Sequence, residues 1–444
     1  MLSTKGLPTP ADSMDRPLRF CMITTFYPPY NFGGDGIYVH ALANELGRRG
    51  HHIDVIHCRD AYRSLAGRDP AKSYADHANV RVHRLSSSYG FLSPLATQQT
   101  GFPLFKSTRI RQILEQPFDV IHYHNISLVG GPKILEYGRG IKIFTMHDYW
   151  LVCPTHALFR FNRAPCTQPH CFLCTLVYKR PPQWWRYSSL LKTAVKNVDA
   201  FIAPSLTSQH KHQQMGLNAR IVHIPNFVPR TQPAAPISDQ SNVRAPERPY
   251  FLFVGRLEKL KGLQTIIPIF RHYRKAQLWI AGTGSEESWL RQLTQGSANI
   301  RFLGYQTGQP LQTLYQHAVA VLYPSINFQI GVPKITVTSG QGAPLVIMEA
   351  FSQQTPVIAS QGGTIPALIE QSGGGLVYST EDELMRVMDQ LLTDPCYRRE
   401  LGLHGYHAYQ QKWTVEAHLE RYFALIDEIA ATHSRRVVQQ ASQS

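Results

Sequence analysis

The chain has 444 residues, which predicts two or three domains at roughly 150 residues per domain. Hydrophobic residues make up 43% and charged residues 17%, a balance that excludes disorder and coiled coil for most of the chain. The 45 Lys and Arg against 30 Asp and Glu leave a net charge of +15. A charge of this size favours an acidic partner such as nucleic acid, an anionic membrane or a phosphorylated small molecule.

The cysteines and the first residues bear on the cellular compartment. No apolar run reaches the ~18 residues of a membrane-spanning helix, and MLSTKGLPTPADSMDRP lacks the apolar core of a secretory signal. The 7 cysteines are an odd number, which without an export signal favours a reducing environment. The composition therefore predicts a soluble, basic, multidomain protein of the cytoplasm.

Short apolar strands alternate with helix-length segments, a pattern typical of a parallel sheet built from βαβ units. In the first half the predicted strands are 18–25, 53–57, 80–85, 118–123, 141–146 and 199–203. In the second half they are 250–254, 277–281, 299–303, 319–323 and 356–360. Between these sets, residues 230–249 are rich in Pro, Ser, Asn and Gln and predict a linker. We therefore expect two doubly wound Rossmann-like domains, at 17–229 and 250–412, and a polar tail that frays after residue 433.

Three loops are candidates for ligand binding, because ligands of such sheets lie beyond the carboxyl ends of the strands. Gly33 and Gly34 precede a helix, where bare backbone can approach a phosphate, although a tight turn explains the pair equally well. Arg256 and Lys261 flank another helix start and suit a diphosphate, although a solvated surface pair would have the same pattern. Glu349 lies one turn inside the helix after SGQGAPL, where a solvated carboxylate is the alternative.

Longer motifs carry a resemblance to a known family. FVGRLEKLKG, FLGYQTGQPLQTLY and PLVIMEAFSQQTPVIASQGGTIPALIE resemble the nucleotide-sugar domain of family-4 retaining glycosyltransferases, which have the GT-B fold. FYPPYNFGGDGIYVHALANELGRRGHHIDVIH, FDVIHYHN, TMHDYW and IVHIPNFV are similar to the family's first domain and follow in its order. WTVE resembles the start of its final helix, so residues 413–432 should pack back on the first domain. The resemblance implies two domains facing across a cleft, a UDP- or GDP-sugar donor, a glycan or lipid-linked acceptor, and no cofactor needed for catalysis.

The resemblance also implies roles for individual residues. Arg256 and Lys261 would hold the donor diphosphate and stabilise its charge as the sugar bond breaks. Glu349 would accept hydrogen bonds from the ribose hydroxyls, since a carboxylate only accepts. His147 would lie near the reacting sugar, with a core histidine as the alternative. The further donor-binding positions are Gly33, Gly34, Gly304, Tyr305, Ala343, Pro344 and Leu345.

Gln341 departs from the family pattern. The family has a carboxylate eight residues before the ribose Glu, and no Asp or Glu occurs between Ser288 and Met348 to replace it. The family acid is mainly a binder of sugar hydroxyls, because the departing diphosphate is thought to help deprotonate the acceptor. An amide can partly fill that role with its own donor and acceptor. We therefore interpret Gln341 as a residue that tunes the donor sugar, and an inactive enzyme remains the alternative.

Four of the 7 cysteines gather in the spacing C-x12-C-x4-C-x2-C. Few apolar residues separate them, which suits a loop closed around a tetrahedral structural zinc. HDYWLVCP followed by a Cys-rich insert also resembles a subset of family-4 transferases. Unrelated thiols are the alternative. The candidate ligands are Cys153, Cys166, Cys171 and Cys174.

Basic charge is concentrated between Leu151 and Arg230, where ten Lys or Arg accompany one acid, Asp199. KRPPQWWRYSSLLK combines cations with Trp184 and Trp185, a composition that can lie on an anionic bilayer. A packed helix with buried Trp is an equal alternative. The membrane interpretation would make the protein peripheral on the inner face of the membrane.

Other functions fit the sequence less well. A nucleic-acid-binding protein would explain the charge but not the ordered phosphate loops, and no RNA- or DNA-reading motif is present, so we expect no nucleic-acid partner. A lapsed GT-B protein that only binds or regulates is favoured by Gln341 alone. An epimerase on the same fold would interconvert sugars without an acceptor.

Overall fold

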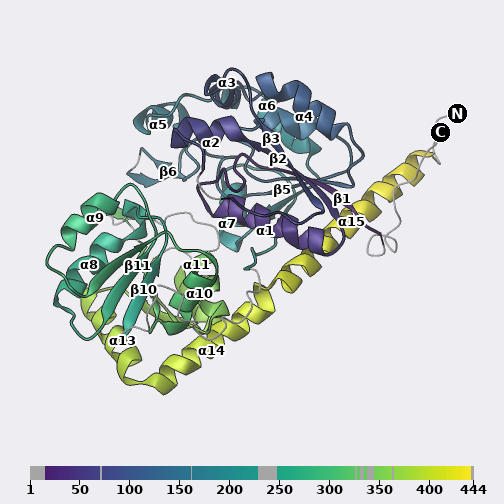
Figure 1. The fold of residues 1–444 in the computed structure, drawn as a ribbon. Helices are drawn as coiled ribbons and strands as arrows, with labels where there is room; N and C mark the ends of the chain where they lie inside the picture. Colours follow the sequence, from purple (N-terminus) through teal and green to yellow (C-terminus); the bar gives the residue numbers. More distant parts are fainter. Residues whose placement is uncertain are drawn as a thin grey trace. The chain divides into compact units, whose positions relative to one another are not determined.

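The computed structural model describes residues 16–70, 73–161, 163–228, 248–325, 328–330, 335–337, 345–362 and 365–441 (Figure 1). The chain divides into two compact units. The N-terminal unit comprises Met1–Asn162, Gln168–Pro225 and Leu419–Ser444, and the C-terminal unit comprises Arg163–Thr167 and Asn226–His418. Nearly all of the predicted linker at 230–249 lies outside the described residues.

A seven-stranded parallel sheet forms the centre of the N-terminal unit, in the order β3-β2-β1-β4-β5-β8-β9. Its strands are β1 (Arg19–Ile23), β2 (His52–Cys58), β3 (Val80–Leu85), β4 (Val120–Tyr123), β5 (Ile141–Thr145), β8 (Ala200–Ala203) and β9 (Ile221–His223). Most of their apolar side chains are buried, which explains the continuous apolar runs in the sequence. Strand order reverses between β1 and β4, so a switch point lies between these two neighbours.

Helices cover both faces of this sheet (Figure 1). They are α1 (Gly34–Arg48), α2 (Arg59–Ala66), α3 (Leu92–Thr100), α4 (Ser107–Leu114), α5 (Cys171–Val177), α6 (Leu190–Ala194), α7 (Leu206–Gln214) and most of α15 (Val415–Ala441). On α15, the Tyr422 ring stacks on Phe20 of β1 with centroids 6.4 Å apart. His433 Nε2 lies 2.8 Å from Asp199 Oδ1, which anchors the last turns. The helix extends to Ala441, so the segment after His433 is helical and the predicted fraying there is wrong.

The C-terminal unit has a six-stranded parallel sheet in the order β12-β11-β10-β13-β16-β17. Its strands are β10 (Tyr250–Val254), β11 (Gln277–Ala281), β12 (Ile300–Gly304), β13 (Val321–Tyr323), β16 (Val357–Ser360) and β17 (Gly375–Tyr378). Its helices are α8 (Leu263–His272), α9 (Glu287–Leu293), α10 (Gly308–His317), α11 (Leu345–Ser352), α12 (Ile365–Ser372), α13 (Glu381–Thr393) and α14 (Pro395–Lys412). Here the switch point lies between β10 and β13.

All of the predicted strands are present, with ends that differ by no more than two residues. Two edge strands, β9 and β17, were not predicted, because they are short and only half-buried for most of their length. The short strands β6 (Phe159–Arg160), β7 (Ala164–Pro165), β14 (Phe328–Ile330) and β15 (Ile335–Val337) were also missed. The expectation of two doubly wound Rossmann-like sheets is confirmed.

Candidate active site

Three loops meet at the carboxyl ends of β10, β11 and β12 in the C-terminal unit. The Gly255 N–H donates to the Ala281 carbonyl over 3.0 Å, and the Gly282 N–H donates to the Gly304 carbonyl over 2.7 Å. The Leu257 N–H donates to Thr283 O over 3.0 Å. These bonds join the three loops into one backbone platform next to the switch point.

Glycine is required where these loops touch. Gly255 has φ +154° and Gly282 has φ +151°, a region that other residues rarely adopt. A Cβ on Gly282 would collide with the Gly255 carbonyl oxygen, and one on Gly284 would collide with Leu257 O. The sequence analysis missed Gly282 and Gly284, whose only signal is a G-x-G directly after a strand. They brace the loop that carries Arg256 and Lys261.

Arg256 and Lys261 follow β10, but their surroundings differ. Arg256 Nη2 lies 2.7 Å from Glu258 Oε1, and its side chain is 59% exposed. Lys261 ends the 3-10 turn Lys259–Lys261, just before α8. Burial lowers the pKa of Lys261 to about 8, opposed by Glu258 and assisted by Arg256. A solvated surface pair therefore describes Arg256 only, whereas Lys261 is a desolvated cation beside the switch point.

Glu349 lies on α11, in the segment after β13 on the other side of the same switch point. Its Oε2 accepts a 2.7 Å hydrogen bond from the Tyr315 hydroxyl of α10. Burial raises the pKa of Glu349, and the bond from Tyr315 works in the opposite direction. The carboxylate is half-buried and hydrogen-bonded, so a freely solvated helix residue is excluded.

Some of the other residues predicted to bind the donor sugar nucleotide are described by the structure and some are not. Gly304 ends β12 with φ +69°, and the exposed Tyr305 follows it. Leu345 is the first residue of α11 and is half-buried. The predicted residues Gln341, Ala343 and Pro344 lie outside the described residues.

In the N-terminal unit, Gly33 and Gly34 lie where the loop after β1 enters α1. Gly33 precedes the first helical residue in an extended conformation. Asn31 brackets it, donating from Nδ2 to Gly33 O over 2.7 Å and accepting from Gly33 N at 3.4 Å. A Cβ at Gly36 would collide with the Asn31 amide and crowd Phe26 O, so the tightest glycine of this helix start is one that we did not single out.

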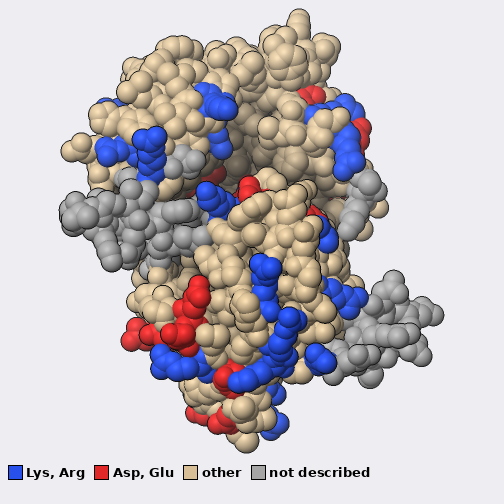
Figure 2. Space-filling view, turned by 90° about the vertical axis from the view of Figure 1, so that its left-hand side faces the viewer, with Lys and Arg blue, Asp and Glu red and all other residues tan. Residues whose placement is uncertain are grey.

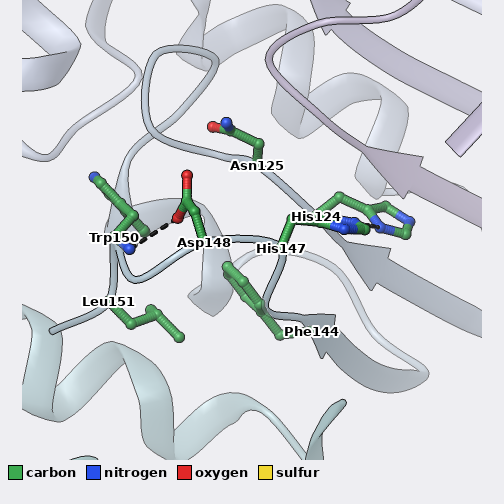
Figure 3. Close-up of a pocket in the computed structure, with 7 residues that line it drawn as sticks. All are labelled: His124, Asn125, Phe144, His147, Asp148, Trp150 and Leu151. Carbon is green, nitrogen blue, oxygen red and sulfur yellow. Dashed lines mark hydrogen bonds between the residues drawn. The ribbon is translucent and has the colours of Figure 1, made fainter. Parts of the chain in front are cut away.

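His147 follows β5 and lines a small pocket of the N-terminal unit (Figure 3). Its Nε2 lies 3.0 Å from His124 Nδ1, and its ring is only half-buried. Burial lowers the pKa of His147, although Asp35 and Asp148 work to raise it. The role of His147 near the sugar stays a prediction, with a core histidine as the alternative. The pocket is lined by His124, Asn125, Phe144, His147, Asp148, Trp150 and Leu151.

Asp148, beside His147, is tied to its own loop. Its Oδ1 accepts from Trp150 N over 2.8 Å, the contact drawn in Figure 3, and its Oδ2 lies 2.7 Å from His156 Nδ1. Burial works to raise the pKa of Asp148, but His156 and the Trp150 N–H outweigh it, and the pKa lies below its usual range. Asp148 is therefore an anion that orients the pocket wall.

The Cys-rich insert does not assemble a recognisable metal site in the part of the chain that the structure describes. No group of three or more His, Cys, Asp or Glu there is arranged to hold a metal ion. Cys166 falls in the C-terminal unit, whereas Cys153, Cys171 and Cys174 fall in the N-terminal unit. Burial raises the pKa of the Cys171 thiol. The geometry gives the structural zinc no support, and it stays a prediction.

The aromatic segment after the insert is divided between core and surface. Trp185 is buried and donates from Nε1 to Gln98 O of α3 over 2.9 Å, whereas Trp184 is 57% exposed. The Arg186 guanidinium lies 4.4 Å from the Trp185 ring centroid and donates to the carbonyls of Trp150 and Leu151. Burial lowers the pKa of Arg186 to about 10. Burial of a Trp is therefore confirmed for Trp185 only, and the membrane interpretation of the exposed Trp184 stays a prediction.

The two sheets and the residues at their switch points define a class of α/β proteins that bind nucleotides beyond the strand ends. Residues 235–408 match the family model described as glycosyl transferases group 1, and residues 32–232 match the one described as Glycosyltransferase Family 4. An uncharacterized glycosyltransferase of Methanocaldococcus jannaschii is 30% identical over 402 residues, covering 86% of this chain and 90% of the relative. The chain belongs to glycosyltransferase family 4.

Further relatives agree with this assignment. A D-inositol 3-phosphate glycosyltransferase of Corynebacterium diphtheriae is 26% identical over 454 residues, covering 94% of this chain and 97% of the relative. Sucrose-phosphate synthase from Thermosynechococcus elongatus has a TM-score of 0.65 at 19% identity, over 96% of this chain and 100% of that one. Anabaena HepE, solved in complex with UDP-glucose, has a TM-score of 0.58 at 18% identity, over 94% of this chain and 100% of that one. These solved structures show that the fold is GT-B.

Within the described residues, no helix has the length and apolar character that a membrane crossing would need.

Proposed function

We propose that the protein is a retaining glycosyltransferase that moves a sugar from a nucleotide-sugar donor to a glycan or lipid-linked acceptor. The proposed setting is polysaccharide or glycolipid biosynthesis. The observation that carries the proposal is the desolvated Lys261, beside Arg256 and at the same switch point as Glu349. A half-buried, desolvated lysine beyond the end of a parallel strand is suited to a polyanion such as a diphosphate.

The donor is proposed to lie against the three-loop platform. Arg256 would exchange Glu258 for a phosphate oxygen, and Lys261 would stabilise the charge that grows on the diphosphate as the sugar leaves. Glu349, held by Tyr315, would accept both ribose hydroxyls. The base would lie on Gly304 and Tyr305. Support for this class of donor comes from HepE, which was solved with UDP, and from a relative named as GDP-mannose-dependent.

The diphosphate assignment is tested by removing each cation. Charge-assisted hydrogen bonds to phosphate contribute about 1.5–3 kcal/mol, so Arg256→Ala and Lys261→Ala should each weaken UDP or GDP binding by about tenfold to a hundredfold. Lys259→Ala is the matched control, because this exposed lysine belongs to the same 3-10 turn. Wild-type affinity in the double variant would refute the assignment. A thermal-shift panel of UDP-, GDP- and ADP-sugars would identify the base.

A catalytically lapsed binding protein is the second candidate, and Gln341 is the observation that favours it. If Gln341 binds donor sugar, Gln341→Ala should lower turnover and leave the affinity for free nucleoside diphosphate unchanged. Gln341→Glu should be tolerated, since the two side chains are nearly isosteric. A wild-type protein without transfer or hydrolysis, together with a gain of activity in Gln341→Glu, would establish the lapsed enzyme instead.

We also propose that the N-terminal unit docks on an anionic membrane surface. Phe172 and Leu173 of α5 are exposed, and the Phe172 ring lies 6.0 Å from that of exposed Trp184. Exposed Lys179 and Arg180 follow directly, which gives the segment the charge that anionic headgroups attract. Figure 2 shows broad uncharged areas on the visible face of this unit, with Lys and Arg at separate points.

Vesicle sedimentation tests the docking. Trp184→Ala with Leu173→Ser should reduce binding to vesicles containing anionic lipid, and neutral vesicles should bind little in every case. Trp289→Ala is the matched control, since Trp289 is an exposed Trp of the C-terminal unit. Equal binding by the wild type and the double variant would refute this surface.

A further inference from the structure

The histidine motif at the end of β4 leads directly to the pocket. His122 and His124 are two residues apart, so both side chains point to the same side of the sheet, and their ring centroids lie 4.0 Å apart. His124 Nδ1 then reaches His147 Nε2 over 3.0 Å. Three imidazole rings therefore form one continuous row. The second and third, His124 and His147, line the pocket (Figure 3).

His122, at the buried end of this row, is held by hydrogen bonds with two other elements. His122 Nδ1 lies 2.9 Å from the Tyr422 hydroxyl of α15, and His122 Nε2 lies 2.8 Å from Thr145 Oγ1 of β5. Tyr38 of α1 closes the side of the row, with its ring edge-on to His124 and His147 at centroid distances of 6.2 and 5.2 Å. Because His122 and Tyr422 are fully buried, the row cannot rotate without breaking these contacts.

The contact between His124 and His147 also couples their protonation. Two neutral imidazole nitrogens 3.0 Å apart share one proton, so one ring donates and the other accepts. A neutral imidazole carries its proton on only one of its two nitrogens. If His147 Nε2 accepts from His124, His147 Nδ1 is therefore a donor, and if Nε2 donates, Nδ1 is an acceptor. An outer partner that sets the tautomer of a functional histidine in this way changes activity without touching the substrate.

We propose that His124 is a positioning residue that holds the ring orientation and tautomer of His147, with His122 and Tyr422 as its support. This inference rests on the proposed function, in which His147 lies near the transferred sugar. It predicts that the final helix α15 contributes to turnover through Tyr422. Neither His124 nor Tyr422 needs to contact the donor.

Two substitutions of His124 separate positioning from packing. The amide of an Asn can place a polar group near the position of the His Nδ1, whereas Leu fills similar space without hydrogen bonding. His124→Leu should lower kcat by about tenfold to a hundredfold, the range known for loss of the partner that orients a metal-binding histidine. His124→Asn should recover most of this loss. The Kd for UDP should stay at the wild-type value in both variants.

Tyr422→Phe and a histidine control complete the test. Tyr422→Phe keeps the ring but removes the hydroxyl that bonds His122, so kcat should fall by less than in His124→Leu. His57→Leu is the matched control, because His57 is a buried histidine of the same sheet whose ring packs against Tyr27 and Tyr30 instead. Its kcat should remain that of the wild type.

The outcomes distinguish this inference from the proposed function. Wild-type kcat in His124→Leu, or equal loss in His124→Leu and His124→Asn, would overturn the inference alone. A parallel loss of kcat and UDP affinity in His124→Leu would indicate general damage to the fold and would also overturn it. A wild-type protein that transfers and hydrolyses no donor would overturn the proposed function, and the inference with it.

Discussion

Lys261 should make nucleotide binding depend on pH between 7 and 9. Its pKa is lowered to about 8 by burial, which places the loss of its charge inside this range. The ratio of ammonium to amine changes tenfold for each pH unit away from the pKa. The charged fraction is therefore about 10/11 at pH 7 and about 1/11 at pH 9.

The size of the effect follows from these fractions. If only the ammonium form binds the diphosphate, the Kd for UDP should rise about tenfold between pH 7 and pH 9. The terminal phosphate contributes little to this change, because its second pKa of about 6 leaves it about 10/11 ionised at pH 7 and almost fully ionised at pH 9. A bound anion raises the pKa of the lysine, so binding at pH 8 should take up about half a proton.

Isothermal titration calorimetry in buffers of different protonation enthalpy measures both the Kd and the proton uptake. Lys261→Arg is the decisive variant, since a guanidinium keeps its charge up to pH 9 and should give a flat profile. Lys259→Ala should retain the wild-type slope. A wild-type Kd that is constant from pH 7 to 9, or an equal slope in Lys261→Arg, would refute this account of Lys261.

Three further predictions concern single contacts. Tyr315→Phe removes the hydrogen-bond donor to Glu349 and so raises the pKa of the Glu349 carboxyl further. In the same calorimetry, the affinity for UDP should therefore fall more at pH 5.5 than at pH 8. An equal loss of affinity at the two pH values would contradict this. Gly284→Ala should weaken UDP binding and lower the Tm in a thermal-shift assay, because its Cβ collides with Leu257 O, whereas unchanged values would show that the platform is not needed. Within the described residues neither ring nitrogen of His57 has a hydrogen-bond partner, and its pKa is lowered to about 3 by burial. Below about pH 6.5 the unfolded state binds a proton on this histidine and the folded state does not, so the free energy of unfolding of the wild type should fall as the pH drops. In urea unfolding at pH 7 and pH 5, His57→Leu should lose less stability than the wild type, and an equal loss would refute the reasoning.

The sequence predicted the strands well because buried parallel strands form continuous apolar runs, as in β10 and β11. The missed strand β17 is half-buried throughout, so its sequence shows no such run. Site geometry was harder to predict, because its decisive contacts join distant residues. Tyr315 and Glu349 are 34 residues apart, and Tyr422 and His122 are 300 apart. No pattern of neighbouring residues in the sequence predicts either contact.

Cysteine spacing predicts a closed metal loop, which stays a prediction, and no signal in the sequence indicated the contacts of the aromatic segment that follows the Cys-rich insert. That segment contains a desolvated arginine, Arg186, which the sequence analysis treated only as part of a basic segment. The chemistry of Arg186 depends on two Trp rings and on backbone carbonyls of a different loop. Spacing rules do not include such partners, which explains why the sequence analysis missed this residue.

Arg186 has a practical consequence for exchanging parts between related enzymes. Through its bonds to the Trp150 and Leu151 carbonyls, Arg186 of the segment after the insert supplies hydrogen-bond donors for two residues of the pocket wall. Gln183 holds the same guanidinium, since Oε1 accepts from Arg186 Nε over 2.6 Å. A chimera that removes the insert together with this following segment would leave two carbonyls without these donors beside His147. A workable graft boundary should therefore lie after Arg186, so that the pocket and its supporting segment come from one parent.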